Sequence, residues 1–242
     1  GKTTTISMLS TLLLPTKGSI QIDGEPLTRK NDRLKRKLSV VTQEYSMRQD
    51  MTMDEIMEYQ GRLYFMPRKQ IKERTEELLE FCDLLKFRKR TVRKLSGGMK
   101  RKLMVCRALL TDPEILLLDE PTAGMDALSR RQMWNLLRKL NEKNLTILLT
   151  THYMEEAQSL CNRVALMDHG KLEEVSTPSA LIESLGAYAV DEMTADGTQN
   201  HYFHTRQEAI RYLEELTGQA SLRETTLEDV FVERAGKHLI SK

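Results

Sequence analysis

The sequence is poor in the residue types that mark disulfide-rich or membrane-spanning proteins. It contains only three cysteines in 242 residues, and Cys82, Cys106 and Cys161 are far apart, without the spacing of a metal-binding motif. Three scattered thiols fit a reducing compartment better than a disulfide framework. No apolar run approaches the roughly 18 residues that a membrane-spanning helix requires. The sequence therefore offers neither a disulfide framework nor a candidate membrane span.

A surplus of charge is missing as well. The net charge is only +2, which is too small to indicate a nucleic-acid partner. One stretch, residues 86–107, is nevertheless rich in Lys and Arg and contains no acidic residue. It is either a nucleic-acid patch or a solvated helical face near an anion site. Aromatic residues for base stacking are nearly absent there, which favours the second interpretation.

The most informative stretch runs from Ile115 to Thr122. Four apolar residues, Ile115 to Leu118, lead directly into Asp119 and Glu120. A continuous apolar run of this length is typical of a strand buried on both faces, as in a parallel sheet. Open α/β sheets bind ligands at the carboxyl edge, where these two acids would lie. A buried carboxylate is costly unless it is paired or holds a metal, so the pattern indicates a metal-phosphate site, although a strand followed by an acidic turn would look the same.

The first residues, Gly1 to Thr5, match the end of a phosphate-binding loop, G-x-x-x-x-G-K-[ST], of which only the last Gly is present. In such a loop, backbone N–H groups surround the phosphates at a helix N-terminus. Lys2 would reach the terminal phosphates, and the Thr3 hydroxyl would bind Mg²⁺. We expect the sequence to be a fragment, or to be numbered from within a longer chain.

Two short strands follow, and then a helical segment. Residues 18–24 predict a half-buried strand that ends in an Asp-Gly turn, and residues 38–42 predict a second strand with Gln43 at its end. From about residue 51 to residue 94 the apolar spacing becomes helical, with Thr52 as a candidate cap. This pattern predicts a helical insertion between two strands of the sheet.

Further polar residues stand at helix starts and at a strand end. Ser96, Gly97 and Gly98 open a helix, where Ser96 can cap and the two glycines expose backbone amides to a ligand. Asp126 ends a turn before another helix, and His152 follows the β-branched strand of residues 146–151. Gln43, Asp119 and His152 thus stand at three strand ends, which would converge on one edge of one sheet.

The last third of the chain predicts one more core strand and a small appendage. Residues 163–168 form the strand, and the core is expected to close near Leu185. Two strands around Asp196-Gly197 predict a hairpin, residues 208–216 an amphipathic helix, and Thr225 with Glu228 a capping box. We therefore expect a domain of residues 1–185, with a helical subdomain at about 51–110, and an α+β appendage of residues 186–242.

These motifs, in this order and spacing, resemble the ATP-binding subunit of an ABC transporter. The resemblance covers residues 1 to about 185, and the Leu95-Ser96-Gly97-Gly98 signature before Asp-Glu-Pro-Thr is its most specific part. Residues 150–157 and 227–231 resemble, more narrowly, bacterial subunits that drive drug, antibiotic or sodium efflux permeases. The resemblance implies an α/β fold: a P-loop NTPase core with a mainly parallel sheet, an antiparallel β element and an inserted helical subdomain.

The resemblance also implies a role for each motif residue. ATP and Mg²⁺ are the expected cofactors, with Glu120 and His152 as catalytic residues that act on the attacking water and the terminal phosphate. The ligands of Mg²⁺ would be Thr3, Gln43 and Asp119. The nucleotide-binding residues would be Gly1, Lys2, Thr3, Thr4, Gln43 and Asp119, with Ser96, Gly97, Gly98 and Asp126 acting on ATP held by a second subunit.

The implied function is an ATP-hydrolysing motor that powers export through a separate membrane permease. Its partners would be a second ATP-binding subunit, in a homodimer, and the permease, with no nucleic acid. Its place would be the cytoplasmic face of the cell membrane, as a peripheral protein. Two alternatives stay open: a soluble ABC-type ATPase without a membrane partner, and a truncated fragment that folds but binds nucleotide poorly.

The segment after Gln43 carries a further hypothesis. Tyr45, Met47, Met51, Met53 and Met57 are flexible or aromatic apolar residues, which suit an adaptable contact. Part of residues 44–59 would then line a groove for a short cytoplasmic helix of the permease. The alternative is that these side chains pack inside the helical insertion itself.

Overall fold

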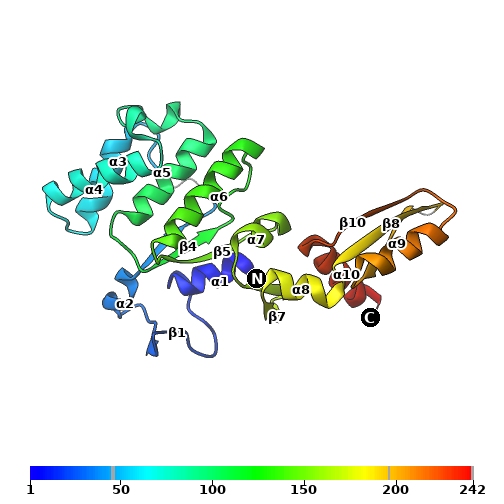
Figure 1. The fold of residues 1–242 in the computed structure, drawn as a ribbon. Coiled ribbons are helices and arrows are strands. Elements are labelled where there is room, and N and C mark those ends of the chain that lie inside the picture. The colour runs from blue at the N-terminus through cyan, green and yellow to red at the C-terminus, as the bar shows by residue number, and fades with distance from the viewer. Residues whose placement is uncertain (45–46, 196, 241–242) are drawn as a thin grey trace. The chain divides into compact units, whose positions relative to one another are not determined.

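The protein is described by a computed structural model that covers residues 1–44, 47–195 and 197–240, with side chains as far as Arg234. Its contacts divide the chain into two compact units, one of residues 2–152 and one from residue 153 onward that also includes Gly1 (Figure 1). These units divide between His152 and Tyr153, earlier than the domain boundary that we predicted near residue 185. The division into domains remains a prediction, and each unit is described by itself below.

The first unit is built around a parallel sheet of three strands. The strands are β3 (Leu38–Val41), β4 (Ile115–Asp119) and β5 (Thr146–Thr150), and β4 lies in the middle. Both pairings are parallel, with Leu118 opposite Val41 and Leu149. The apolar run is buried as predicted, because Leu116, Leu117 and Leu118 are at most 2% exposed. The α/β fold with a parallel sheet is therefore confirmed.

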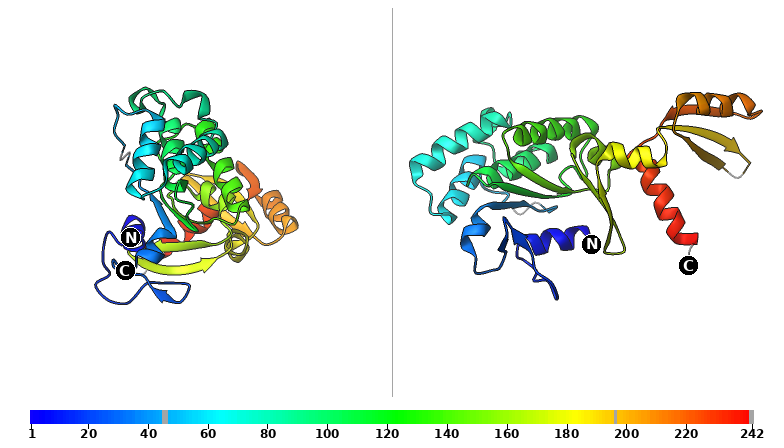
Figure 2. Two further views of the ribbon diagram at one scale, coloured as in Figure 1. Left: turned by 90° about the vertical axis from the view of Figure 1, so that its left-hand side faces the viewer. Right: turned by 60° about the horizontal axis from the view of Figure 1, so that its bottom comes forward.

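Helices cover both faces of this sheet. The helix α1 (Lys2–Leu9) lies on one side of it, and α5 (Gly97–Leu109) and α6 (Ala127–Glu142) lie on the other (Figures 1 and 2). The apolar face of α6 is buried, and it includes Trp134, whose burial the sequence did not decide. In a sheet with helices on both faces, the carboxyl ends of the strands are the expected place for a ligand.

An antiparallel element precedes the sheet along the chain. The strands β1 (Gln21–Ile22) and β2 (Glu25–Pro26) pair across Asp23 and Gly24, whose φ angles are 53° and 79°. Positive φ at both central residues is the geometry of a tight hairpin turn, for which Asp-Gly is a preferred pair. The predicted Asp-Gly turn is thus confirmed, and the short helix α2 (Asp32–Arg36) leads from it into β3.

The predicted helical insertion is present between β3 and β4. It contains α3 (Met53–Leu63), α4 (Arg68–Phe81), the short 3-10 helices η1 (Leu85–Phe87) and η2 (Val92–Lys94), and then α5. Thr52 caps α3, since its hydroxyl accepts a hydrogen bond from the Glu55 amide while the Glu55 carboxylate accepts one from the Thr52 amide. This reciprocal pair is a capping box, which fixes where the helix begins.

The methionines of this segment do not line an open groove. Met53 and Met57 are fully buried and Met47 is 7% exposed, so they pack inside the insertion. Our hypothesis that these methionines contact a permease helix is therefore wrong for these three, because their side chains are buried instead. Met51, which was also proposed for that contact, is half-buried, so its part of the hypothesis stays a prediction. Tyr45 lies outside the described residues.

Part of the basic stretch forms ion pairs and cation–ring contacts within the insertion. Arg88 and Lys89 both pair with Asp54, at 2.9 Å and 3.0 Å, and Lys86 and Arg90 lie over the ring of Phe87. These contacts connect η1 and its following turn to the start of α3. They support the interpretation of this stretch as a helical face rather than as a nucleic-acid patch.

The second unit begins with a helix, a hairpin and another helix. These are α7 (Met154–Leu160), the antiparallel strands β6 (Val164–Asp168) and β7 (Lys171–Ser176), and α8 (Pro178–Leu185). The sequence predicted β6 as one more core strand and did not predict β7. Instead, β6 pairs with β7 in a separate two-stranded sheet, because a tight turn at His169 and Gly170, both with positive φ, returns the chain along it. Near the end of the chain, α10 (Leu227–Ile240) packs against both α7 and α8 through Leu227 and Val230. Residues 153–185 therefore share an apolar core with the C-terminal helix, which explains why the contacts group them together.

A three-stranded antiparallel sheet and a helix complete the second unit. The strand order is β10 (Ala220–Glu224), β8 (Tyr188–Thr194), β9 (Gly197–Phe203), and α9 (Arg206–Glu215) packs against this sheet. The predicted hairpin is confirmed, because Thr194 and Gly197 are paired at its end. Asp196 itself lies outside the described residues.

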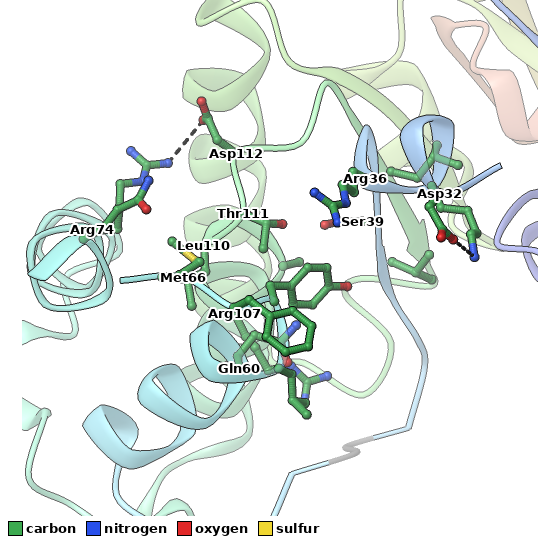
Figure 3. A pocket seen from close by; sticks show the side chains of 18 of the residues that line it. Asp32, Arg36, Ser39, Gln60, Met66, Arg74, Arg107, Leu110, Thr111 and Asp112 are labelled. Carbon is green, nitrogen blue, oxygen red and sulfur yellow. Dashed lines mark hydrogen bonds and ion pairs between the residues drawn. The ribbon is translucent and has the colours of Figure 1, made fainter. Parts of the chain in front are cut away.

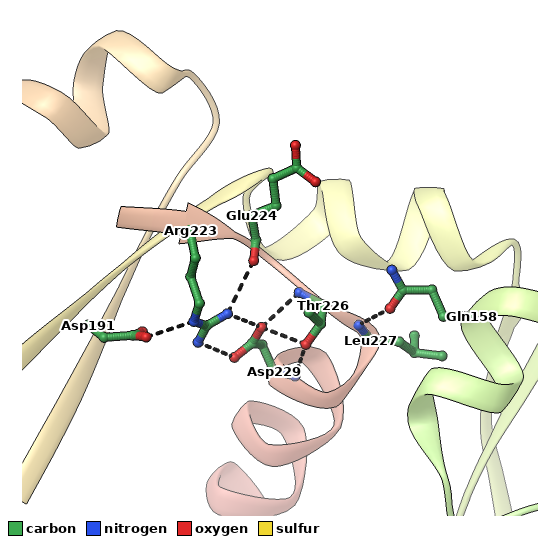
Figure 4. A network of polar contacts seen from close by, with 7 residues as sticks. All are labelled: Gln158, Asp191, Arg223, Glu224, Thr226, Leu227 and Asp229. Atoms are coloured by element: carbon green, nitrogen blue, oxygen red, sulfur yellow. Dashed lines mark hydrogen bonds and ion pairs between the residues drawn. The ribbon is translucent and has the colours of Figure 1, made fainter. Parts of the chain in front are cut away.

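A polar network fixes the start of α10 (Figure 4). Arg223 donates two 2.7 Å hydrogen bonds to the Asp229 carboxylate and a third to Asp191. The Thr226 amide and hydroxyl also donate to Asp229. The cap of this helix is therefore Thr226 with Asp229, one residue later than the predicted pair of Thr225 and Glu228. The arginine explains the choice, because it can reach only a carboxylate that faces β10.

Candidate functional site

A buried carboxylate marks the carboxyl end of the central strand. Asp119, the last residue of β4, is only 3% exposed. Its Oδ1 accepts a 2.5 Å hydrogen bond from the Thr150 hydroxyl at the end of β5, and a longer one of 3.4 Å from the Thr3 hydroxyl on α1. A buried carboxylate needs such donors to offset the loss of water. The sequence predicted Asp119 and Thr3 at one site, and the structure brings them together.

Glu120 is turned out of the strand by an uncommon backbone conformation. Its φ angle is +46°, in the left-handed region that residues other than Gly seldom adopt. The Glu120 amide donates to both the carbonyl oxygen and the hydroxyl of Thr150, at 3.0 Å and 3.2 Å. These two bonds hold the turn in place, and they direct the Glu120 side chain away from the buried position of Asp119.

Three polar side chains from three strand ends meet at Glu120. Oε2 of Glu120 lies 3.2 Å from Nδ1 of His152, which follows β5. The same oxygen accepts a hydrogen bond of 3.5 Å from the side-chain amide of Gln43, which follows β3. The sequence predicted that Gln43, Asp119 and His152 would converge at this edge. In the structure Gln43 and His152 contact Glu120 instead, because Asp119 is buried and accepts its hydrogen bonds from Thr150 and Thr3.

The N-terminal helix contributes a cation to this edge. The Lys2 ammonium donates a 2.9 Å hydrogen bond to the carbonyl oxygen of Thr151, directly before His152. Thr4 lies on the same helix and is exposed. Gly1 is grouped by its contacts with the second unit, where a Cβ added to it would lie 2.5 Å from Sδ of Met167. Lys2 and Thr3 thus belong to the site in this structure, and Gly1 is described apart from it.

The signature residues form a second group at two helix N-termini. Ser96 caps α5 by accepting a hydrogen bond from the Met99 amide, and Asp126 caps α6 by accepting one from the Ser129 amide. The Ser129 hydroxyl also donates to Asp126 at 2.6 Å, and a Cβ added to Gly98 would lie 3.0 Å from that hydroxyl oxygen. Ser129 thus lies beside both Gly98 and Asp126, although 28 positions separate those two residues in the chain.

Exposure and charge distinguish this second group from the first. Ser96, Gly97 and Asp126 are exposed, in contrast to the buried Asp119. The hydrogen bond from the Ser129 hydroxyl, together with backbone amides, lowers the pKa of Asp126 below its usual range. An ionised Asp126 at a helix N-terminus interacts favourably with the helix dipole. The group is thus an accessible surface of amides and one carboxylate.

Two residues of the site were not predicted from the sequence. Thr150 was identified only as part of a strand, yet its hydroxyl bridges Asp119 and the Glu120 amide. Arg101 was counted only as part of the basic stretch, yet it is 3% exposed and contacts the same strand ends. The signal for Arg101 was available, because it lies on the apolar face of α5, at helical spacing from Met104 and Ala108.

The oxygen groups at the strand ends fit a magnesium ion. Thr3 and Asp119 place a hydroxyl and a carboxylate 3.4 Å apart, and Gln43 carries an amide oxygen at the neighbouring strand end. Within the described residues, no group of three or more His, Cys, Asp or Glu side chains could hold a metal ion. Mg²⁺ prefers such a sparse set, since it keeps waters and phosphate oxygens among its ligands.

Comparison with known proteins gives one consistent result. The family described as "ABC transporter" matches residues 1–123. The chain is 35% identical to the Nod factor export ATP-binding protein I of Cupriavidus metallidurans, over 99% of this chain and 86% of that protein. It is 34% identical to the linearmycin resistance ATP-binding protein LnrL of Bacillus subtilis, over 81% of this chain and 63% of that protein.

Two further matches agree with these. The daunorubicin/doxorubicin resistance ATP-binding protein DrrA of Streptomyces peucetius is 38% identical, over 77% of this chain and 57% of that protein. Among solved structures, the ATP-binding subunit of an ABC transporter superposes with a TM-score of 0.66, at 24% identity, over 76% of this chain and 77% of the other. The structural likeness supports the fold, and the sequence matches carry the relationship.

Proposed function

Because this chain belongs to the ABC transporter family, as an ATP-binding domain with ATPase activity, we propose that it is the motor subunit of an exporter. In this proposal, hydrolysis of ATP powers transport through a separate integral membrane permease. The observation that carries it is the convergence of Gln43, Glu120 and His152 at one sheet edge, next to Lys2 and Asp119. The names of the relatives, which describe export and resistance, support the direction of transport.

The geometry suggests how these residues divide the work on ATP. Phosphoryl transfer depends mainly on positioning and on stabilisation of charge. Gly1, Lys2, Thr3 and Thr4 would bind the phosphates, with the Lys2 ammonium already directed to this edge by Thr151. Thr3, Gln43 and Asp119 would hold Mg²⁺, which neutralises phosphate charge when it is bound. Asp119 suits an indirect contact through water, since Thr150 and Thr3 already donate to it.

Glu120 and His152 are the proposed catalytic residues. The Glu120 carboxylate would accept a proton from the attacking water, or orient that water, while His152 contacts the terminal phosphate. The 3.2 Å contact between His152 Nδ1 and Glu120 Oε2 keeps both side chains at the reacting end of the nucleotide. A general base of this kind contributes a rate factor of about 10²–10⁴.

The signature group suits a second copy of the protein. Ser96, Gly97, Gly98 and Asp126 would bind the terminal phosphate of ATP held by a partner subunit in a homodimer. Their exposure at two helix N-termini supports this role, because such amides favour anions. Closure of two subunits on ATP would complete each site and exclude water, which couples hydrolysis to a movement.

A pocket beside the helical insertion suits the permease. It has a volume of about 750 Å³ and lies between β3 and the C-terminal ends of α3 and α5 (Figure 3). Four basic and two acidic side chains line it, and Lys35 pairs with Asp32 while Arg74 pairs with Asp112. The excess of basic over acidic side chains in the lining, together with the apolar rim, favours an amphipathic helix that carries both apolar and acidic side chains.

The exposed residues at the rim indicate which surface the helix would contact. Leu63, Tyr64 and Phe65 are 55%, 48% and 92% exposed, and Phe65 has a φ angle of 57°. A bulky residue held in the left-handed region and exposed to solvent is costly in isolation. No helix in the described part of the chain is long and apolar enough to cross a membrane. In this proposal, the contact with the permease would hold the subunit as a peripheral protein at the cytoplasmic face of the membrane.

The substitution Glu120→Gln tests the proposal on the native protein. The amide keeps the shape of the side chain but cannot take up a proton. We expect ATP binding in calorimetry to be retained and phosphate release to fall by about 100-fold or more. The matched control is Glu114→Gln at the opposite end of β4, where Glu114 is exposed and pairs with Lys37. Near-normal phosphate release by Glu120→Gln would reject the catalytic role.

The same preparation separates the two alternatives. Cosedimentation with membranes only when the permease is present would support the motor of an exporter. Full ATPase activity in a protein that never associates with membranes would support an ABC-type ATPase without a membrane partner. Absence of ATP binding in calorimetry would support a chain that folds without binding nucleotide.

A further inference from the structure

Arg101 is the most deeply buried cation of the site. It lies on α5, one turn after the Gly97-Gly98 pair, and is 3% exposed. Arginine is seldom buried to this extent unless its charge is satisfied by partners. The hydrogen-bond partners of this guanidinium therefore indicate what Arg101 does in the site.

The guanidinium donates to five main-chain carbonyl oxygens. Nη1 donates to the carbonyls of Thr42 and Gln43, at 2.7 Å and 3.1 Å. Nη2 donates to those of Asp119 and Glu120, at 2.9 Å and 2.6 Å, and Nε donates to that of Pro121, at 2.8 Å. Five acceptors match the five N–H groups of arginine in number. The carbonyls belong to two segments, the residues that follow β3 and those that end β4.

These two segments carry Gln43, Asp119 and Glu120. Of the five carbonyls, only that of Asp119 belongs to a strand residue. The pairing of β3 with β4 ends at Val41 and Leu118, so the sheet's own hydrogen bonds do not fix the separation of the two segments beyond it. Glu120 in addition adopts the left-handed backbone, which is sterically unfavourable for a residue with a side chain. The guanidinium can offset this cost, because it binds the carbonyls on both sides of the strained residue.

We infer that Arg101 is a positioning residue that sets the two strand ends, and hence Gln43 and Glu120, relative to each other and to α5. This inference rests on the proposed function. It adds a physical link within one subunit: α5 begins at the signature residues that would contact a partner's ATP, and one turn later it holds the strand ends of its own site. Displacement of α5 would then be transmitted to Glu120 through the guanidinium.

Lysine cannot replace this arrangement. An ammonium group has three donors around one point, whereas the carbonyls of two segments require a planar group with donors on three sides. Arg101→Lys keeps the charge and loses at least two of the five hydrogen bonds. Arg101→Met removes all of them and leaves buried carbonyls without donors, which is a heavier cost to folding. The lysine variant is therefore the principal test.

The test compares Arg101→Lys with Arg138→Lys, the same change at an exposed position of α6 in the same unit. For Arg101→Lys we expect kcat for ATP hydrolysis to fall by about 10- to 100-fold while KM changes by less than about threefold, since Lys2 and Thr3 bind the phosphates from α1. Arg138→Lys should keep both constants. A kcat that stays near the wild-type value, or a KM that rises as much as kcat falls, would overturn the inference.

Hydrogen–deuterium exchange gives a second reading that does not depend on activity. In Arg101→Lys, peptides that contain residues 42–44 and 119–125 should exchange about tenfold faster, while peptides from α6 should be unchanged. Equal acceleration throughout the first unit would show a structural role only and would overturn the inference. If the wild type does not hydrolyse ATP, the proposed function fails, whereas the exchange result still decides whether Arg101 positions the strand ends.

Discussion

Nδ1 of His152 lies 3.2 Å from Oε2 of Glu120, although the two residues follow different strands, β5 and β4. The contact orients both side chains at the edge of the sheet. Because Gln43 donates to the same carboxylate oxygen, the position of Glu120 depends on two neighbours. Loss of either neighbour should therefore lower the rate of ATP hydrolysis more than it weakens ATP binding.

The first prediction concerns His152→Ala. The change removes the contact with Glu120 and the proposed contact with the terminal phosphate, and we expect phosphate release to fall by about 100-fold. ATP binding in calorimetry should weaken by less than tenfold, because the phosphates are held mainly by α1. The control is His169→Ala, where an exposed histidine pairs with Asp168 in the second unit. Loss of activity in the control would show that the effect is not specific to the site.

A second prediction concerns stability at the buried acid. Thr150→Val keeps the shape of the side chain but removes the hydroxyl that donates to Asp119 at 2.5 Å. We expect the free energy of unfolding to fall by about 1–3 kcal/mol, because a buried carboxylate loses a donor. Urea denaturation measures the change. Thr146→Val, at the exposed start of β5, should alter it by less than about 0.5 kcal/mol.

The third prediction tests the docking pocket through Phe65→Asn. Asparagine tolerates the left-handed backbone that Phe65 adopts, so the fold should be kept. Transport in membrane vesicles should fall by at least tenfold while the basal ATPase activity of the isolated subunit stays within about twofold. Leu12→Asn, which also removes an exposed apolar side chain from the first unit, should leave transport unchanged. Normal transport by Phe65→Asn would place the permease elsewhere.

The fourth prediction concerns acid and the second unit. Burial opposes ionisation of Asp229, but hydrogen bonds from Arg223 and from Thr226 outweigh it and hold the pKa of Asp229 below its usual value of about 3.9. A depressed pKa in the folded state stabilises the protein above the unfolded pKa, and this stability is lost as the pH falls through the folded value. The unit should therefore lose stability below about pH 4.

Asp229→Asn isolates this contribution. At pH 7 the variant should be less stable by about 1–3 kcal/mol, because Arg223 loses its charged partner. Below about pH 4 the difference from the wild type should begin to shrink, since the unfolded wild type then takes up a proton at Asp229 while the folded state still resists it. Thermal unfolding at pH 7 and pH 3 measures both effects. A constant difference at the two pH values would contradict the assignment to Asp229.

The sequence by itself determined the order of elements and most of the site. The run of Ile115 to Leu118 into Asp119 indicated a buried central strand, and the structure confirms it. Gln43 and His152 could be placed because parallel strands end at one edge, so that a position at a strand end already implies a neighbour. Caps such as Thr52 and Ser96 were also predictable, since a cap acts within four residues of chain.

Only the tertiary structure decided which groups that are far apart in the sequence form hydrogen bonds or pack against one another. Arg101 binds carbonyl oxygens, which every residue has, so no sequence pattern marks its partners. The burial of Met53 and Met57 likewise depends on which helix face meets its neighbours, because a flexible apolar side chain suits a surface groove and an interior equally well. Thr226 rather than Thr225 caps α10 because Arg223, on the preceding strand β10, reaches Asp229. Local patterns select an element, whereas contacts between elements are settled only when the chain has folded.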